Sequence, residues 1–174
     1  MDRIIYPQPG GPIAVILAVQ IERQSGESER DALLRHARQL LPEGTPLAVV
    51  TEDALPTDRS WRNAWAATFP ADDDGKPTQV TIDMDLAREV HRGRLRAART
   101  PLLAELDTAF LQAIEAGDPA AQAAIASRKQ ALRDAPGAAA ITTAKTPEAL
   151  ITSIADPALR ERYATLLTTA KETR

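Results

Sequence analysis

The chain has 174 residues, which suffices for one compact domain or for a small domain with an appended helical arm, but not for two large domains. Its net charge of −3 and pI near 5.5 exclude the bulk positive field that dominates duplex nucleic-acid binding. Cysteine is absent, which removes disulfides, thiolate chemistry and cysteine-ligated zinc, and fits a reducing compartment such as the bacterial cytoplasm.

Residues 1–82 predict a small mixed unit. Ile13 to Val19 is a continuous apolar run that predicts a strand, and Leu47 to Val50 predicts a second one. Between them, Glu27 to Leu41 carries leucines and alanines at helical spacing. A β-α-β order follows, although a hairpin with an extra helix fits equally well. The longest apolar run is far below the roughly 20 residues that span a bilayer, and its flanks predict no signal peptide.

The next segment predicts a turn, a strand and then mostly helix. Asp72 to Asp74 begin an acidic, turn-rich loop, Gln79 to Ile82 predict a short strand, and Asp83 is suited to cap a helix. Beyond Asp83 each expected helix boundary pairs an N-cap oxygen with a proline preset for the first helical position. These boundaries are Thr100-Pro101, Asp118-Pro119, Thr146-Pro147 and Asp156-Pro157.

Residues 83–135 predict an antiparallel helical hairpin that turns at Gly117 and Asp118. Residues that face each other should then have numbers that sum to about 235, which pairs Leu103 with Leu132, Phe110 with Ile125 and Ile114 with Ala121. The same register brings Glu105 and Asp107 near Arg128 and Lys129, so the charges are complementary too. The predicted fold class is therefore α+β, with a small N-terminal β-α-β unit followed by a mainly helical region that contains this hairpin.

The base of the hairpin is less regular. The apolar side of the predicted helix changes at Thr100-Pro101, where a proline inside a helix costs a hydrogen bond and predicts a kink or a break. Residues 83–99 should then pack against the N-terminal unit or another protein. In residues 136–174 we expect a linker that starts at Ala135-Pro136-Gly137 and then helices from Pro147 and from Pro157 toward Thr169.

Catalytic signatures are missing from the sequence. It has no nucleophile elbow, Walker loop, dinucleotide fingerprint or zinc-protease motif, and His36 and His91 stand alone in different predicted elements. Asp72 to Asp74 lack the alternating ligands and closing glutamate of a calcium loop, so a solvated turn is favoured. We therefore predict no catalytic, cofactor-binding or metal-binding residues, and no enzyme.

Two features are candidate sites of protein contact. Arg88, Arg92, Arg96 and Arg99 fall within about 80° of arc on an ideal helix, with Arg94 pointing elsewhere. A solvated helix face is the leading interpretation, binding to an acidic protein surface comes second, and nucleic acid comes last. Trp61, Arg62 and Trp65 form the other feature. The tryptophans are four residues apart, which favours a core role and leaves an interface role open.

A group of motifs resembles a known family. They are Pro42-Glu43-Gly44-Thr45-Pro46, Leu55-Pro56-Thr57-Asp58-Arg59-Ser60-Trp61-Arg62-Asn63-Ala64-Trp65, Ile82-Asp83-Met84 with Ala87-Arg88-Glu89, Leu106-Asp107, and Lys129-Gln130-Ala131-Leu132-Arg133-Asp134. In this order they resemble the phage tail assembly chaperones of tailed phages and prophages, well over roughly Leu41 to Pro136 and loosely before it. Trp61 stands where relatives are expected to have phenylalanine, and the segment beyond Thr146 exceeds what the family predicts.

The resemblance implies a non-enzymatic protein that helps to build the tail or its fibres by binding a tail or tail-fibre protein, without a cofactor. It would act in the host bacterial cytoplasm during assembly. The alternatives are a structural component retained in the virion tail and, from another class, a small nucleic-acid-binding protein. A homo-oligomer is a further candidate assembly, and no membrane contact is predicted.

Overall fold

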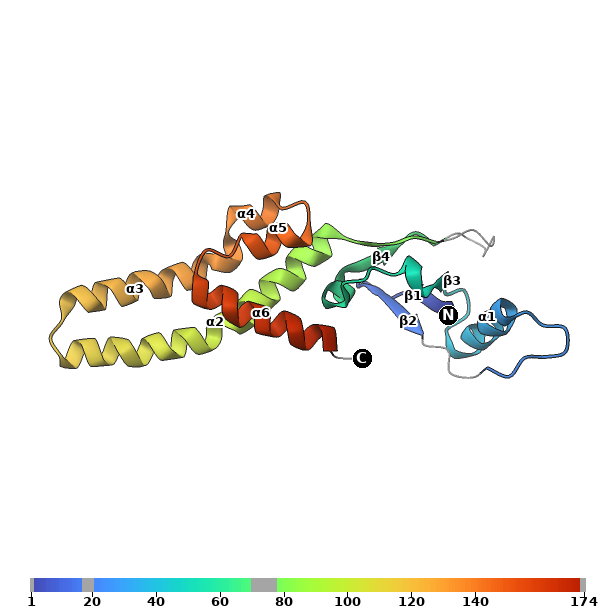
Figure 1. Ribbon diagram of the computed structural model, residues 1–174, viewed down its shortest axis with the longest axis horizontal. Coiled ribbons are helices and arrows are strands. Elements are labelled where there is room, and N and C mark those ends of the chain that lie inside the picture. The colour runs from blue at the N-terminus through green and yellow to red at the C-terminus, as the bar shows by residue number, and fades with distance from the viewer. Residues whose placement is uncertain (1, 17–20, 70–77, 173–174) are drawn as a thin grey trace. The chain divides into compact units, whose positions relative to one another are not determined.

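The computed structural model describes residues 2–16, 21–69 and 78–172. As predicted, the fold class is α+β, with a small β region first and a mostly helical region after it (Figure 1). The chain divides into two compact units, residues 1–86 and 87–174. The predicted hairpin and the predicted C-terminal segment therefore lie in one compact unit.

A three-stranded antiparallel sheet forms the centre of the first unit. Strand β1 (Asp2–Pro7) lies between β2 (Ile13–Ile16) and β3 (Ala48–Thr51), and Ile5 pairs with Val15 on one side and with Ala48 on the other. The predicted strands correspond to β2 and β3, whereas β1 is not among the predicted elements. The two predicted strands thus do not pair with each other, because β1 separates them.

Neighbouring residues of a strand point to opposite faces of the sheet, and each face packs against its own buried cluster. On one side Ile4 packs with Leu33 and Ala37 of helix α1 (Glu29–Leu40), whose N-cap Ser28 accepts a hydrogen bond from the Asp31 amide. On the other side the buried cluster comprises Ile5, Ile13, Ala48, Val50, Leu55, Trp65 and Val80. The predicted helix between the strands is confirmed.

The rest of the first unit is built from short elements. Two 3₁₀ turns, η1 (Glu52–Ala54) and η2 (Arg59–Ala64), precede strand β4 (Trp65–Ala67). It pairs antiparallel with β5 (Val80–Ile82), which confirms the strand predicted there. The acidic loop Asp72 to Asp74 lies outside the described residues.

Helix α2 (Met84–Glu115) is a single element of 32 residues that contains Pro101, so of the predicted kink or break at Thr100-Pro101 the break does not occur and the kink stays a prediction. Asp83 caps it by accepting from the amides of Asp85 and Leu86. Ala98 and Leu102, on either side of the proline, are both buried. Tertiary packing therefore holds the two halves together across the hydrogen bond that proline cannot make.

The hairpin has the predicted turn and register. Gly117 adopts a positive φ of 64°, and Asp118 caps α3 (Pro119–Asp134) by accepting from the Ala121 amide. Asp107 forms an ion pair with Lys129, and the Gln122 side chain donates to the Ala113 carbonyl at 3.2 Å. Both contacts agree with the predicted sum of about 235 within one residue. Figure 1 shows α2 and α3 side by side in a long arm, which we call the arm.

The C-terminal segment is helical from its start. Where the sequence predicts a linker, η3 (Ala135–Gly137) and α4 (Ala139–Thr143) bury Pro136 and Ile141. Helices α5 (Pro147–Thr152) and α6 (Pro157–Glu172) begin at the predicted prolines. The linker prediction fails because small residues such as alanine and glycine suit close packing of helices as well as they suit flexible chain.

The first half of α2 packs against these C-terminal helices. Its buried residues Ala87, His91, Leu95 and Ala98 recur every three or four positions. Leu95 shares a hollow with Ile154 and Leu159, and His91 contacts Tyr163 of α6. The sequence predicted the N-terminal unit or another protein as the partner of residues 83–99. The chain's own C-terminal helices supply that partner instead.

Candidate protein-binding surface

The tryptophan motif is part of the interior. Trp61 is 1% exposed in η2, and Trp65 is 5% exposed at the start of β4, where it belongs to the sheet cluster. They therefore do not share one face of a helix, as the spacing suggested. Arg62, between them, is half-buried. In this arrangement the two indole rings contribute to the core, which is the leading interpretation of the sequence.

We call Arg88, Arg92, Arg96 and Arg99 on α2 the arginine stripe. Two of these four arginines support the fold directly. Arg88 donates to the Ala144 carbonyl at 2.8 Å, at the C-terminal end of α4. Arg99 donates to the carbonyls of Leu132 and Arg133, at the C-terminal end of α3. The last carbonyls of a helix have no partner within it and carry partial negative charge, so a guanidinium satisfies them well. Arg88 and Arg99 thus hold three helices together, and neither is simply solvated.

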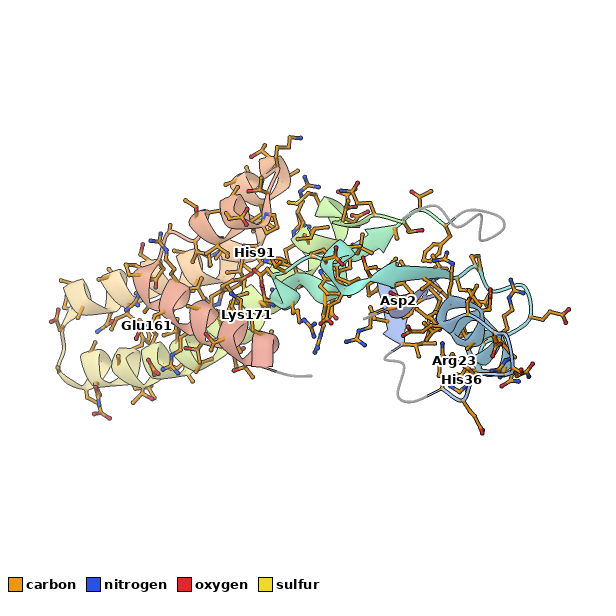
Figure 2. The ribbon with its side chains drawn as sticks, turned by 45° about the vertical axis from the view of Figure 1, so that its right-hand side comes forward. Asp2, Arg23, His36, His91, Glu161 and Lys171 are labelled. Carbon is orange, nitrogen blue, oxygen red and sulfur yellow. The ribbon has the colours of Figure 1, made fainter. Side chains whose placement is uncertain are left out.

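A buried polar pair joins α2 to α6 beside this stripe. His91 is fully buried, and its Nδ1 lies 2.7 Å from the hydroxyl oxygen of Tyr163, which is also fully buried. Burial lowers the pKa of His91 to about 4, and the nearby guanidiniums of Arg94 and Arg92 act in the same direction. Burial raises the pKa of Tyr163, an effect that Arg94 opposes. His91, which is labelled in Figure 2, is therefore a neutral packing residue at neutral pH.

Large apolar side chains are exposed at three described positions: Leu40, Leu111 and Ile114, with exposed fractions of 60%, 61% and 49%. Two of them lie near the tip of the arm. Counting about 100° per residue, Leu103, Phe110, Leu111 and Ile114 span about 100° of α2. Leu103 and Phe110 are half-buried. We call these four residues the apolar arm face.

The C-terminal helices cover the other side of the arm. Glu105, about 180° away from Ile114 on α2, accepts a hydrogen bond from Arg162 of α6 at 2.8 Å. On α3, Arg128 forms an ion pair with Asp156 at 3.2 Å, directly before α6. On the apolar arm face, Phe110 lies beneath Lys129 of α3, which also pairs with the neighbouring Asp107, whereas Leu111 and Ile114 at the tip remain exposed. Arg92 and Arg96 lie on the same side of α2, and Arg96 is exposed.

A hollow of about 350 Å³ lies between α2, α3, α5 and α6. Its walls are mostly apolar, from Leu95, Leu132, Ile154 and Leu159. The carboxylate of Asp156 caps α6 through the Leu159 amide, and the Ser153 hydroxyl donates to the Leu150 carbonyl. The polar groups of the hollow thus hold helix ends in place, and they do not form a nucleophile with an adjacent base.

Within the described part of the chain, no three histidine, aspartate or glutamate side chains come together as a metal site would require. No helix in the ranges 2–16, 21–69 and 78–172 is both long and apolar enough to pass through a bilayer. The chain matches no protein-family model, no curated protein and no solved structure.

Proposed function

We propose that this chain is a non-enzymatic bacteriophage tail protein that binds a tail or tail-fibre protein during assembly, as a chaperone or adaptor. The exposed part of the apolar arm face, Leu111 and Ile114, is the observation that carries the proposal. Leu111 and Ile114 are more exposed than side chains of their size usually are, and an exposed apolar patch framed by charges is typical of protein-binding surfaces. The resemblance of residues 41–136 to phage tail assembly chaperones supplies the biological context.

The arm suits binding better than catalysis. Its contact groups are apolar side chains, with the arginines Arg92 and Arg96 beside them on α2. Apolar burial would supply affinity, while the charges would orient an acidic partner and raise its association rate. Binding of this kind needs no cofactor. The protein would act in the host bacterial cytoplasm while the tail is built.

The test is co-expression of the tagged full chain with a candidate tail-fibre protein, followed by affinity capture. We expect the wild type to retain the partner and Leu111→Asp with Ile114→Asp to lose it. Leu40→Asp is the matched control, because Leu40 is equally exposed but lies on α1, outside the arm. Thermal melting should show that all three chains are folded. Equal capture by the arm variant and the wild type would contradict the proposal.

A structural component of the virion tail remains the alternative. The additional C-terminal helices suggested such a role, but α4 and α6 are already occupied in packing on α2 through Arg88 and His91. Mass spectrometry of purified virions separates the two roles. An assembly chaperone should be missing from virions or substoichiometric in them, and a constant copy number would favour the structural role.

Nucleic-acid binding, the second alternative, has less support once the arginines are placed. Arg88 and Arg99 bind carbonyls, and Arg94 interacts with Tyr163. Duplex binding would weaken by about 0.9 log units per phosphate contact for each log unit of salt. We expect no binding in a low-salt titration with DNA or RNA, and salt-sensitive binding would revive this alternative.

A further inference from the structure

The hollow between α2, α3, α5 and α6 combines large apolar side chains with small residues. Leu95, Leu132, Ile154 and Leu159 line it, and each is at most 3% exposed. The rest of its apolar wall consists of residues with one methyl group or none, all exposed or half-buried: Ala131, Ala135, Gly137, Ala138 and Ala155. Because these small residues reach only a short way across the hollow, its large apolar side chains are accessible from outside.

The volume of the hollow, about 350 Å³, suits a small molecule. Ligand pockets in proteins have volumes of about 300–1,000 Å³, and an apolar cavity of about 150 Å³ already holds one benzene molecule. Space also remains beside Gly137, where an added Cβ atom would meet no described atom within 4 Å. The hollow is therefore large enough for an aromatic ring with a short substituent.

The carboxylates beside the hollow already have partners. Asp134 and Asp156 are the charged residues among the described residues that line it. Asp156 accepts a hydrogen bond from the Leu159 amide at 2.9 Å and pairs with Arg128 at 3.2 Å. Asp134 accepts from the side-chain amide of Gln130 at 3.0 Å, and water solvates it because it is exposed. Neither carboxylate therefore depends on a cationic ligand.

The arginines nearest the wall are engaged as well. Arg160 donates to the Ile154 carbonyl at 3.1 Å, and Arg99 donates to the Leu132 carbonyl at 3.3 Å. Since these charges have partners in the protein, little would offset the desolvation of a charged ligand that entered the hollow. A neutral apolar ligand avoids this cost and displaces water that an apolar wall binds poorly.

We propose that the hollow is a binding site for a small, neutral, apolar molecule that contains about one aromatic ring. The ligand is a free molecule, because the volume exceeds what a single ring needs and lies in the range of pockets that enclose a whole small ligand. The described residues that line the hollow do not include those of the apolar arm face. The inference therefore goes beyond the proposed function and does not depend on it.

The first test titrates toluene into the isotope-labelled full chain and follows the backbone amide signals by nuclear magnetic resonance. We expect saturable shifts at Leu132, Ile154 and Leu159, with a Kd on the order of 1 mM for so small a ligand. The exposed residues Leu111 and Ile114 are the internal control and should show no saturable shift. Equal shifts at the tip of the arm, or no saturable shift in the hollow, would overturn the proposal.

Matched probes test the chemical class of the ligand. Benzylamine and benzoate have the same ring with a positive or a negative group, and each should bind at least about tenfold more weakly than toluene. Equal or tighter binding of either one would contradict a neutral ligand. N-acetylphenylalaninamide presents the ring on a peptide. If it binds more tightly than toluene, the hollow takes a side chain of a partner protein and the proposal of a free ligand fails.

Variants that fill the hollow provide an independent check. Ala131→Phe and Gly137→Leu act from two different walls, and each should weaken toluene binding by at least about tenfold. Ala131 is exposed and Gly137 has free space beside it, so both variants should melt no lower than the wild type. Ala124→Phe is the matched control, because Ala124 is exposed about two turns nearer the tip on the same side of α3. It should keep the wild-type Kd, and unchanged binding in both filling variants would refute the site.

Discussion

His91 of α2 and Tyr163 of α6 form a hydrogen bond of 2.7 Å between Nδ1 and the hydroxyl oxygen, with ring centroids 5.0 Å apart. The two residues are 72 positions apart in the sequence, and both are fully buried. The pair therefore fastens the C-terminal helix to the base of the arm. The other ring nitrogen of His91 is also buried, and it has no partner among the described residues.

Removal of the Tyr163 hydroxyl should destabilise the helical unit. Tyr163→Phe leaves Nδ1 of His91 buried without its partner, which costs about 1–3 kcal/mol. Urea denaturation followed by circular dichroism measures this loss. Tyr6→Phe is the control because Tyr6 is half-buried in β1, and it should change the free energy of unfolding by less than about 0.5 kcal/mol. Equal effects of the two variants would contradict a special role for the buried pair.

The stability of the unit should depend on pH through His91. Its pKa is about 4 in the folded chain against 6.5 for an unperturbed histidine, so between these values the unfolded chain binds more protons. The contribution of His91 is therefore complete above about pH 6.5 and is lost as the pH falls toward 4. The total loss is about 3 kcal/mol.

Denaturation at several pH values tests this linkage. His91→Leu cannot be protonated, so its free energy of unfolding should fall less than that of the wild type over this range. His36→Gln, in α1, is the matched control and should keep the wild-type slope. An unchanged slope in His91→Leu would show that other groups cause the acid sensitivity.

The hairpin register predicts coupled losses at Phe110 and Ile125. Full burial would give about 3–5 and 2–5 kcal/mol for their replacement by alanine. Both side chains are only half-buried, so we expect about 1–3 kcal/mol for each. Denaturation of the two single variants and the double variant provides the test. The losses should not add if the side chains touch, and strict additivity would argue against contact.

The stripe arginines should separate into two classes. If Arg88, Arg92, Arg96 and Arg99 formed a solvated helix face, as the leading interpretation of the sequence has it, changing all four to glutamine would leave the fold intact. The carbonyl contacts of Arg88 and Arg99 contradict that expectation. Arg88→Gln with Arg99→Gln should instead lower the melting temperature, because each hydrogen bond from a charged group contributes about 1.5–3 kcal/mol when shielded from water.

The complementary variant, Arg92→Gln with Arg96→Gln, should keep the wild-type melting temperature and weaken the binding of the tail protein in a salt-dependent way. Differential scanning calorimetry measures the melting temperature, and affinity capture at two salt concentrations measures the binding. If the two double variants melt at the same temperature, the carbonyl contacts do not stabilise the helical unit.

Local patterns in the sequence predicted the elements whose causes are local. Asp83, Asp118 and Thr146 each cap a helix as expected, because an N-cap needs only a side-chain oxygen within reach of the next amides. The arm register followed from the turn at Gly117, since two antiparallel helices joined by a tight turn have only one alignment. The ion pair between Asp107 and Lys129 could therefore be placed from the sequence, whereas Glu105 pairs with Arg162 and Arg128 with Asp156 instead.

Tertiary structure decided where distant segments meet. Strand β1 escaped prediction because the short run Ile4 to Tyr6 becomes a central strand only when β2 and β3 pair with both its edges. Pro101 stays within a helix because packing on both sides outweighs a local cost that the sequence alone shows. The arginine stripe looked uniform for the same reason: only the folding of residues 135–172 onto α2 separates Arg88, which binds a helix end, from Arg96, which remains exposed. Helical periodicity specifies which side of α2 is apolar or charged, but long-range packing chooses what covers it.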